Sequence, residues 1–209
     1  MEFLCYHRDR PGSLPLRQEL GEAHWSYMDG YEQQLIARGP TFDRAAETLT
    51  GSVHIVELPD PAAARAFAFD EPNYQAGAYR DVMVRRWRNA LGRTMWEYPG
   101  GRTGGNRYLV LGLGLPVRLA PGTDTASDTD GGTGTGTGTG TAAAPDLAVP
   151  ADPDGDLIAY GPLLSDDGTT WLGTAAILRA PDAEAARALL TADAYADVEV
   201  HDWEMGGRR

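Results

Sequence analysis

The chain has 209 residues, enough for one large domain or two small ones with a substantial core. Its formal net charge is −12 and its sequence pI is about 4.6. The chain therefore lacks the positive potential with which proteins bind nucleic acid or an anionic membrane surface. Its single cysteine, Cys5, excludes an intramolecular disulfide. No window approaches the ~18 apolar residues of a membrane helix and the N-terminus does not read as a signal peptide, so we expect a cytoplasmic protein.

The first predicted elements are a short strand over residues 3–6 and a long helix over residues 16–38. The helix is predicted because apolar residues recur at intervals of four and then three, which places them on one face. This apolar stripe consists of Leu20, His24, Met28, Tyr31 and Leu35. Gly39 and Pro40 are predicted to end the helix, since glycine suits the C-terminal cap and proline cannot continue a helix.

A second group of elements completes a strand–helix–strand–strand–helix–strand order. The predicted elements are a weak strand over residues 40–44, a strand over 51–58, a helix over 62–69 and a strand over 79–87. Asp60 is a predicted N-cap with Pro61 at the first helical position, and Pro72 prevents the helix from extending further. This order predicts a ferredoxin-like βαββαβ unit.

The C-terminal half repeats this order more weakly. A strand is predicted over residues 106–113, and the region 157–203 contains two strands, a helix over 182–191 and a last strand ending at Trp203. Residues 123–141 include an alternating Gly-Thr tract, which buries too little apolar area to offset its ordering entropy and is predicted to be disordered. We therefore expect two units, residues 1–103 and 104–209, the second degenerate and carrying a disordered Gly/Thr-rich insertion at about 117–150.

His24 is the leading candidate for chemistry. Its place on the apolar stripe between Leu20 and Met28 predicts that its side chain faces the sheet, where a desolvated imidazole stays neutral and can accept a proton. The alternative is a core histidine satisfied by a backbone carbonyl. Asp70 and Glu71, in the turn fixed by Pro72, are candidates for the carboxylate that orients His24, although either could instead be a solvated helix-end acid.

A metal site is not predicted. His7 and His54 fall in predicted strands near Cys5, but zinc sites need three or four ligands with recognisable spacing and none is present. The glycine-rich tract has no following Lys-Ser/Thr and no strand-to-helix setting, so it is not a phosphate-binding loop. The sequence therefore predicts neither metal nor cofactor.

The first unit resembles the YCII-related (YciI-like) family of small dimeric α/β-barrel proteins. The resemblance rests on the helix histidine, the Gly39-Pro40 pair, the Gly51-Ser52 strand, and the acid-proline turn that leads to Ala76–Tyr79 and a valine-rich last strand. It covers residues 1–90, and a weaker match covers 157–203. What it implies is an α+β fold: two ferredoxin-like βαββαβ modules forming an intramolecular dimeric α/β barrel.

The resemblance also implies a site. A His–Asp pair has been suggested as the active centre in this family, and His24 stands at the family's histidine. Aligning on Pro72 places Glu71 at the family's aspartate, whereas one inserted residue places Asp70 there. One branch eliminates hydrogen chloride from a chlorinated hydroquinone, and distant relatives of the fold isomerise lactones. The second unit, which lacks the histidine helix, is expected to be catalytically empty.

Two functions therefore remain open. In the first, His24 acts as general acid or base, oriented by Asp70 or Glu71, in an elimination or isomerisation of a small polar cyclic or aromatic metabolite. In the second, the chain is a non-catalytic ligand-binding or interaction module built as a pseudo-dimer. Either form is expected to bind a small molecule, and to exist as a monomeric pseudo-dimer or as a homodimer.

Overall fold

The first unit is a four-stranded antiparallel sheet covered by helices on one face. A computed structural model describes residues 1–120, 147–152, 154–190 and 194–207. The elements of the first unit are β1 (Glu2–Asp9), α1 (Leu14–Glu19), α2 (Gly21–Asp29), β2 (Leu35–Asp43), β3 (Thr48–Glu57), α3 (Pro61–Phe69), α4 (Pro72–Gln75) and β4 (Tyr79–Trp87). The strands pair in the order β2-β3-β1-β4. This is the ferredoxin-like arrangement.

The second unit has the same strand order and, in the part of it that the structure describes, fewer helices. A 3₁₀ turn, η1 (Met95–Glu97), lies in the connection, followed by β5 (Asn106–Arg118), β6 (Leu157–Leu164), β7 (Thr170–Ala180), α5 (Ala183–Arg187) and β8 (Asp197–Trp203). The strands pair in the order β6-β7-β5-β8. Between β5 and β6, the residues that the structure describes contain no helix. The expected disordered tract at 123–141 lies outside the described residues.

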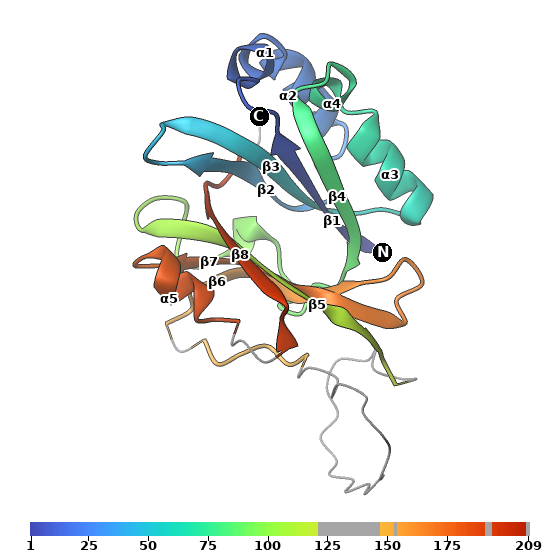
Figure 1. The fold of residues 1–209 in the computed structure, drawn as a ribbon, viewed down its shortest axis with the longest axis vertical. Helices are drawn as coiled ribbons and strands as arrows, with labels where there is room; N and C mark the ends of the chain where they lie inside the picture. The colour runs from blue at the N-terminus through green and yellow to red at the C-terminus, as the bar shows by residue number, and fades with distance from the viewer. Residues whose placement is uncertain (121–146, 153, 191–193, 208–209) are drawn as a thin grey trace, which may run out of the picture.

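The two sheets close into one eight-stranded barrel. Strand β8 of the second unit pairs with β2 of the first, and β4 of the first pairs with β6 of the second. Figure 1 shows the two sheets facing each other, with the first above the second. The expected fold class, two ferredoxin-like modules in an intramolecular dimeric α/β barrel, is thereby confirmed.

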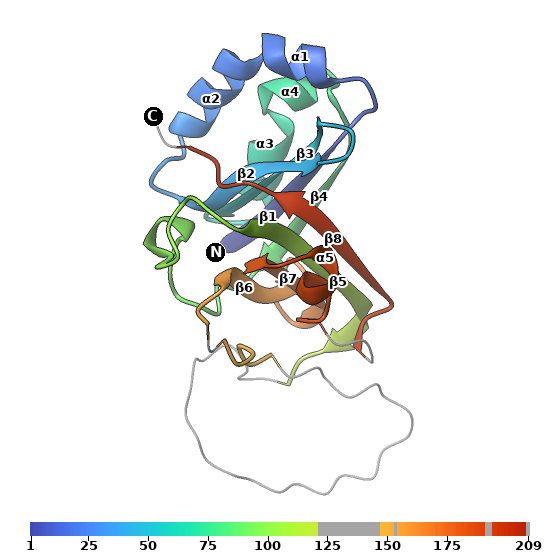
Figure 2. The ribbon, with the colours of Figure 1, turned by 90° about the vertical axis from the view of Figure 1, so that its left-hand side faces the viewer.

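The alternation of side chains along β1 explains both faces of the first sheet. Leu4 and Tyr6 point into the barrel, where they join the core that both units share. Phe3 and Cys5 point outward and pack with Met28 of α2 and with α3. Helices α1–α4 lie over this outer face, whereas among the described residues the second sheet carries α5 alone (Figure 2). The helical layer that can enclose a site therefore belongs to the first unit.

Both seams of the barrel have the same local structure. At one seam the backbone N–H of Glu204, just after β8, donates to the carbonyl of Pro40 over 3.1 Å. At the other seam the N–H of Arg88, just after β4, donates to the carbonyl of Pro162 over 3.2 Å. At each seam the receiving strand carries a Gly-Pro pair, Gly39-Pro40 in β2 and Gly161-Pro162 in β6. The incoming chain packs so closely against the glycine that a Cβ atom would not fit there.

The long helix predicted over residues 16–38 is wrong in its second half. Helix α2 ends at Asp29, and residues 35–43 form β2, so Gly39 and Pro40 lie within a strand and do not end a helix. The strand predicted at 40–44 therefore begins earlier. The reason is that residues 35–39 are buried throughout, and a short buried strand has no alternation that separates it from a helix.

Candidate functional site

His24 lies on the buried face of α2. Its exposed fraction is 9%, and Met28, one turn later, is completely buried against the first sheet. The ring of His24 faces the sheet, with its centroid 5.8 Å from that of His54 on β3. The sequence-based expectation for the orientation of His24 therefore agrees with the structure.

Glu71 is the carboxylate that meets His24. It is fully buried at the N-cap of α4, where Pro72 begins the helix. His24 Nδ1 lies 2.5 Å from Oε1 of Glu71. The side-chain amide of Asn73 donates to the same oxygen over 2.9 Å, and the N–H of Tyr74 donates to Oε2 over 2.9 Å. Both oxygens of a buried carboxylate are thus satisfied, which fixes its direction.

The hydrogen bonds around Glu71 keep it ionised. Burial alone would raise the pKa of the carboxyl group, but hydrogen bonding and charge from His24, together with the N–H of Tyr74, hold that pKa below its ordinary value. An ionised carboxylate only accepts, so the Nδ1 atom of His24 must carry the proton in this contact. In the neutral tautomer with the proton on Nδ1, the Nε2 atom carries the lone pair.

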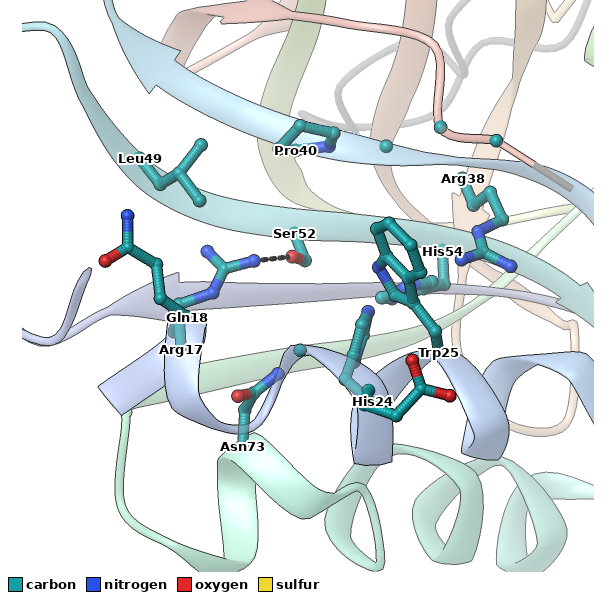
Figure 3. A pocket seen from close by; sticks show the side chains of 15 residues that line it. Arg17, Gln18, His24, Trp25, Arg38, Pro40, Leu49, Ser52, His54 and Asn73 are labelled. Carbon is teal, nitrogen blue, oxygen red and sulfur yellow. Dashed lines mark hydrogen bonds between the residues drawn. The ribbon is translucent and has the colours of Figure 1, made fainter. Parts of the chain in front are cut away.

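The other edge of His24 belongs to a pocket of about 630 Å³ between the helices and the sheet. Figure 3 shows His24 and Trp25 reaching from α2 toward strands β2 and β3. Arg38 and Ser52 line the pocket from those strands. Trp25 is 51% exposed, so the pocket opens to solvent beside a large flat ring.

Arg17 is held rigidly in the same pocket. Its guanidinium contacts the carboxylate of Asp9 at 2.8 Å, with both side chains largely buried. It also donates to the hydroxyl of Ser52 over 2.6 Å, as drawn in Figure 3. Planar, fixed guanidinium groups recognise oxygen atoms in defined directions. Arg17 is therefore suited to position a polar ligand near His24.

Two further histidines pack beside His24. The His54 ring lies 5.7 Å from that of His7, whose Nε2 contacts the carbonyl of Ala68 at 2.9 Å. Burial lowers the pKa of His7 and lowers that of His54 far below its usual range, so both rings are neutral. Among the described residues, no group of three or more His, Cys, Asp or Glu side chains is placed to hold a metal ion.

The remaining candidates lie away from the pocket. Asp70 follows the end of α3 and is exposed, and no hydrogen bond joins it to His24 among the described residues. Cys5 is buried on the outer face of β1, and burial raises the pKa of its thiol to about 12. A thiol in that state is inert as a nucleophile.

Several pocket residues were not recognised in the sequence. Those residues are Arg17, Trp25, Arg38, Ser52 and the pair Gly206–Gly207. Arg17 lies seven residues, or about two helical turns, before His24 in the helical region, a spacing that could have suggested it. Nothing local indicates the two glycines, because they belong to the far end of the chain.

The fold and this site define a ferredoxin-like barrel protein in which a histidine, paired with a buried glutamate, lines a small-molecule-sized pocket. Residues 1–88 match the model of the YCII-related domain. The 5-chloro-2-hydroxyhydroquinone dehydrochlorinase of Burkholderia phenoliruptrix AC1100, solved with 2,5-dihydroxybenzoquinone, is 32% identical over 43% of this chain and 95% of its own, with a TM-score of 0.41. The chain belongs to the YCII-related family.

A second solved structure spans both units. It is a candidate monooxygenase from Lactobacillus acidophilus NCFM, 8% identical, covering 98% of this chain and 93% of its own, with a TM-score of 0.41. No curated protein matches the chain. Within the described residues, no helix is both long enough and apolar enough to cross a membrane.

Proposed function

We propose that the protein is an acid–base enzyme acting on a small, polar, cyclic or aromatic metabolite, with His24 as the proton-transferring group. One observation carries the proposal: a buried carboxylate holds one ring nitrogen of His24 while the ring's other edge lines a pocket. A core histidine satisfied by a backbone carbonyl would have neither feature. Glu71 is the orienting acid, and Asp70 has no part in it.

The proposed reaction begins with proton abstraction. Nε2 of His24 takes a proton from a saturated ring carbon of the substrate, which in a quinol is a carbon of its diketo tautomer. The electrons of that C–H bond form a double bond to the neighbouring carbon, which either bears the leaving group or belongs to an existing double bond that shifts by one carbon. In an elimination the leaving group departs from that neighbouring carbon with its bonding pair. In an isomerisation the proton returns at a different carbon. Glu71 stabilises the imidazolium formed in between, as an acid paired with histidine does in other enzymes.

The substrate class is supported by the relative. A protein 32% identical to the first unit is named for removing chloride from a chlorinated hydroxyhydroquinone. Arg17 and Ser52 offer donors that suit the hydroxyl or oxyanion groups of such a ring. Hydroxylated and halogenated quinols are therefore the first compounds to test.

The proposal extends to the organisation of the chain. Residues 1–103 would form the unit that carries the site, and residues 104–209 a degenerate copy of it. The same strand order in both units and the matching Gly-Pro seams support a duplication. One chain then supplies both halves of the barrel, so the proposed enzyme needs no second copy for closure.

The test compares wild type with His24→Ala and His24→Gln on a panel that includes 5-chloro-2-hydroxyhydroquinone. Chloride release and the ultraviolet spectrum of the ring report turnover, and a thermal shift reports binding. Loss of the histidine should reduce kcat by roughly 10²–10⁴-fold while the fold remains intact. Equal turnover in all three proteins would contradict the proposal. A compound that binds through His24 and is never converted would favour the non-catalytic ligand-binding function instead.

A further inference from the structure

The end of the chain runs across the first unit after β8. The N–H of Glu204 donates to Pro40, and the N–H of Gly206 donates to the carbonyl of Arg38 over 2.8 Å. The guanidinium of Arg102 donates to the carbonyl of Gly206 over 2.9 Å. Figure 2 shows the chain leaving β8 and passing β2. Residues 204–207 are therefore held in place along the edge of β2.

Close packing makes this path specific to glycine. A Cβ atom on Gly39 would overlap the carbonyl oxygen of Glu204. A Cβ atom on Gly206 would lie 2.8 Å from the carbonyl oxygen of Arg38, closer than real Cβ atoms approach. The strand and the tail thus meet backbone to backbone. By contrast, a Cβ atom on Gly207 would have no neighbour within 4 Å.

This tail forms part of the pocket that contains His24. Gly206 and Gly207 line the pocket together with His24 and Trp25, and the side chain of Arg38 lines it from β2. The helices and the sheet belong to the first unit, whereas the tail follows the last strand of the second. The pocket therefore has walls from both units of one chain.

We propose that Gly206 and Gly207 form a wall that limits access to His24 and so limits the size of the ligand that reaches it. The second unit then contributes to the site of the first, although it carries no counterpart of His24. This inference rests on the pocket being the ligand site, but it does not require that His24 be catalytic. Access to His24 can be measured without a substrate.

The test measures the rate at which diethyl pyrocarbonate acylates His24, with peptide mass spectrometry as the readout. A chain truncated after Met205 lacks the wall, whereas a chain truncated after Gly207 retains it and is the matched control. The first truncation should raise the His24 rate several-fold above the control. His201, on β8, does not line this pocket and serves as the internal reference, because a rise at both histidines would indicate a general loosening of the barrel.

Two point variants test the same wall in the full chain. Gly206→Val should displace the tail from Arg38 and raise the His24 rate, whereas Gly207→Val, with open space around it, should not. A rise at His24 without one at His201 supports the wall. An unchanged His24 rate in both the truncated chain and Gly206→Val, or a rise at both histidines, contradicts it. A failure of turnover in the His24 comparison would leave this result standing, so the two proposals fail separately.

Discussion

The Nδ1 atom of His24 lies 2.5 Å from Oε1 of Glu71, across the contact between α2 and the turn before α4. Because Asn73 and Tyr74 also donate to this carboxylate, its two oxygens have fixed directions. The ring of His24 is therefore held in one tautomer, with its second nitrogen available on the pocket side. Orientation by a hydrogen-bonded neighbour is what a histidine base requires.

Glu71→Gln tests this orientation directly. The glutamine side chain has nearly the same shape but can donate as well as accept, so the share of His24 in the Nδ1–H tautomer should fall. Nitrogen NMR of the imidazole measures that share. In any assay of turnover, kcat should fall by about 10²-fold or more, because the imidazolium loses its counter-charge.

Asp70→Asn is the matched control, one residue earlier in the chain. Asp70 is exposed, so this change should leave the tautomer and kcat as they are and shift the free energy of unfolding by no more than about 0.5 kcal/mol. If Asp70→Asn altered the tautomer and Glu71→Gln did not, the pairing of His24 with Glu71 would be wrong.

The sequence predicted elements whose signals are local. The N-cap at Asp60, Pro61 at the start of α3 and the bounds of β4 are all confirmed, because capping and alternation act over a few residues. The choice between Asp70 and Glu71 could not be made from sequence. It depends on how the backbone turns after α3, which leaves one carboxylate in solvent and points the other at α2.

The features missed in the sequence arise from contacts between distant segments. The sequence pattern predicted that Gly39 and Pro40 end a helix. In the structure they lie in β2, and the chain after β8 passes so close to them that a side chain at residue 39 would not fit. The glycines of the pocket wall likewise acquire a role only once the barrel closes. Local patterns therefore identified the histidine and its two candidate acids, but not the enclosure around them.

The helix N-caps Asp60 and Asp182 should contribute equally to the free energy of unfolding. Asp60 accepts from the N–H of Ala63 over 2.8 Å, and Asp182 accepts from the N–H of Ala185 over 2.8 Å. Replacing either aspartate by alanine should lower the free energy of unfolding by about 1 kcal/mol, as measured by urea denaturation. Asp60→Asn keeps a capping oxygen and should be nearly neutral. A cost in the asparagine variant equal to that in the alanine variant would show that charge, and not capping, matters.

The two barrel seams should be equally intolerant of a methyl group. A Cβ atom on Gly39 would overlap the carbonyl of Glu204, and one on Gly161 would overlap the carbonyl of Arg88. Each alanine variant should lose about 1–3 kcal/mol of stability, the usual cost of overpacking. Gly21→Ala is the control, because no atom lies within 4 Å of its added Cβ and alanine favours the helix. Unaltered unfolding of both seam variants would mean that the seams can separate without cost.

Acid should destabilise the fold through His54 before it affects Glu71. Burial holds the pKa of His54 far below 6.5, so below about pH 6.5 the unfolded chain binds a proton that the folded chain excludes. Stability is therefore lost as the pH falls, by up to about 1.4 kcal/mol per pH unit for this group. Glu71, whose pKa is lowered from 4.5, loses its contribution only at more acidic pH.

Urea denaturation between about pH 7.5 and pH 5 measures this loss. The free energy of unfolding should decline less steeply in His54→Leu than in wild type, and His7 should account for part of the decline that remains in the variant. Parallel declines in the two proteins would mean that His54 is protonated within the fold.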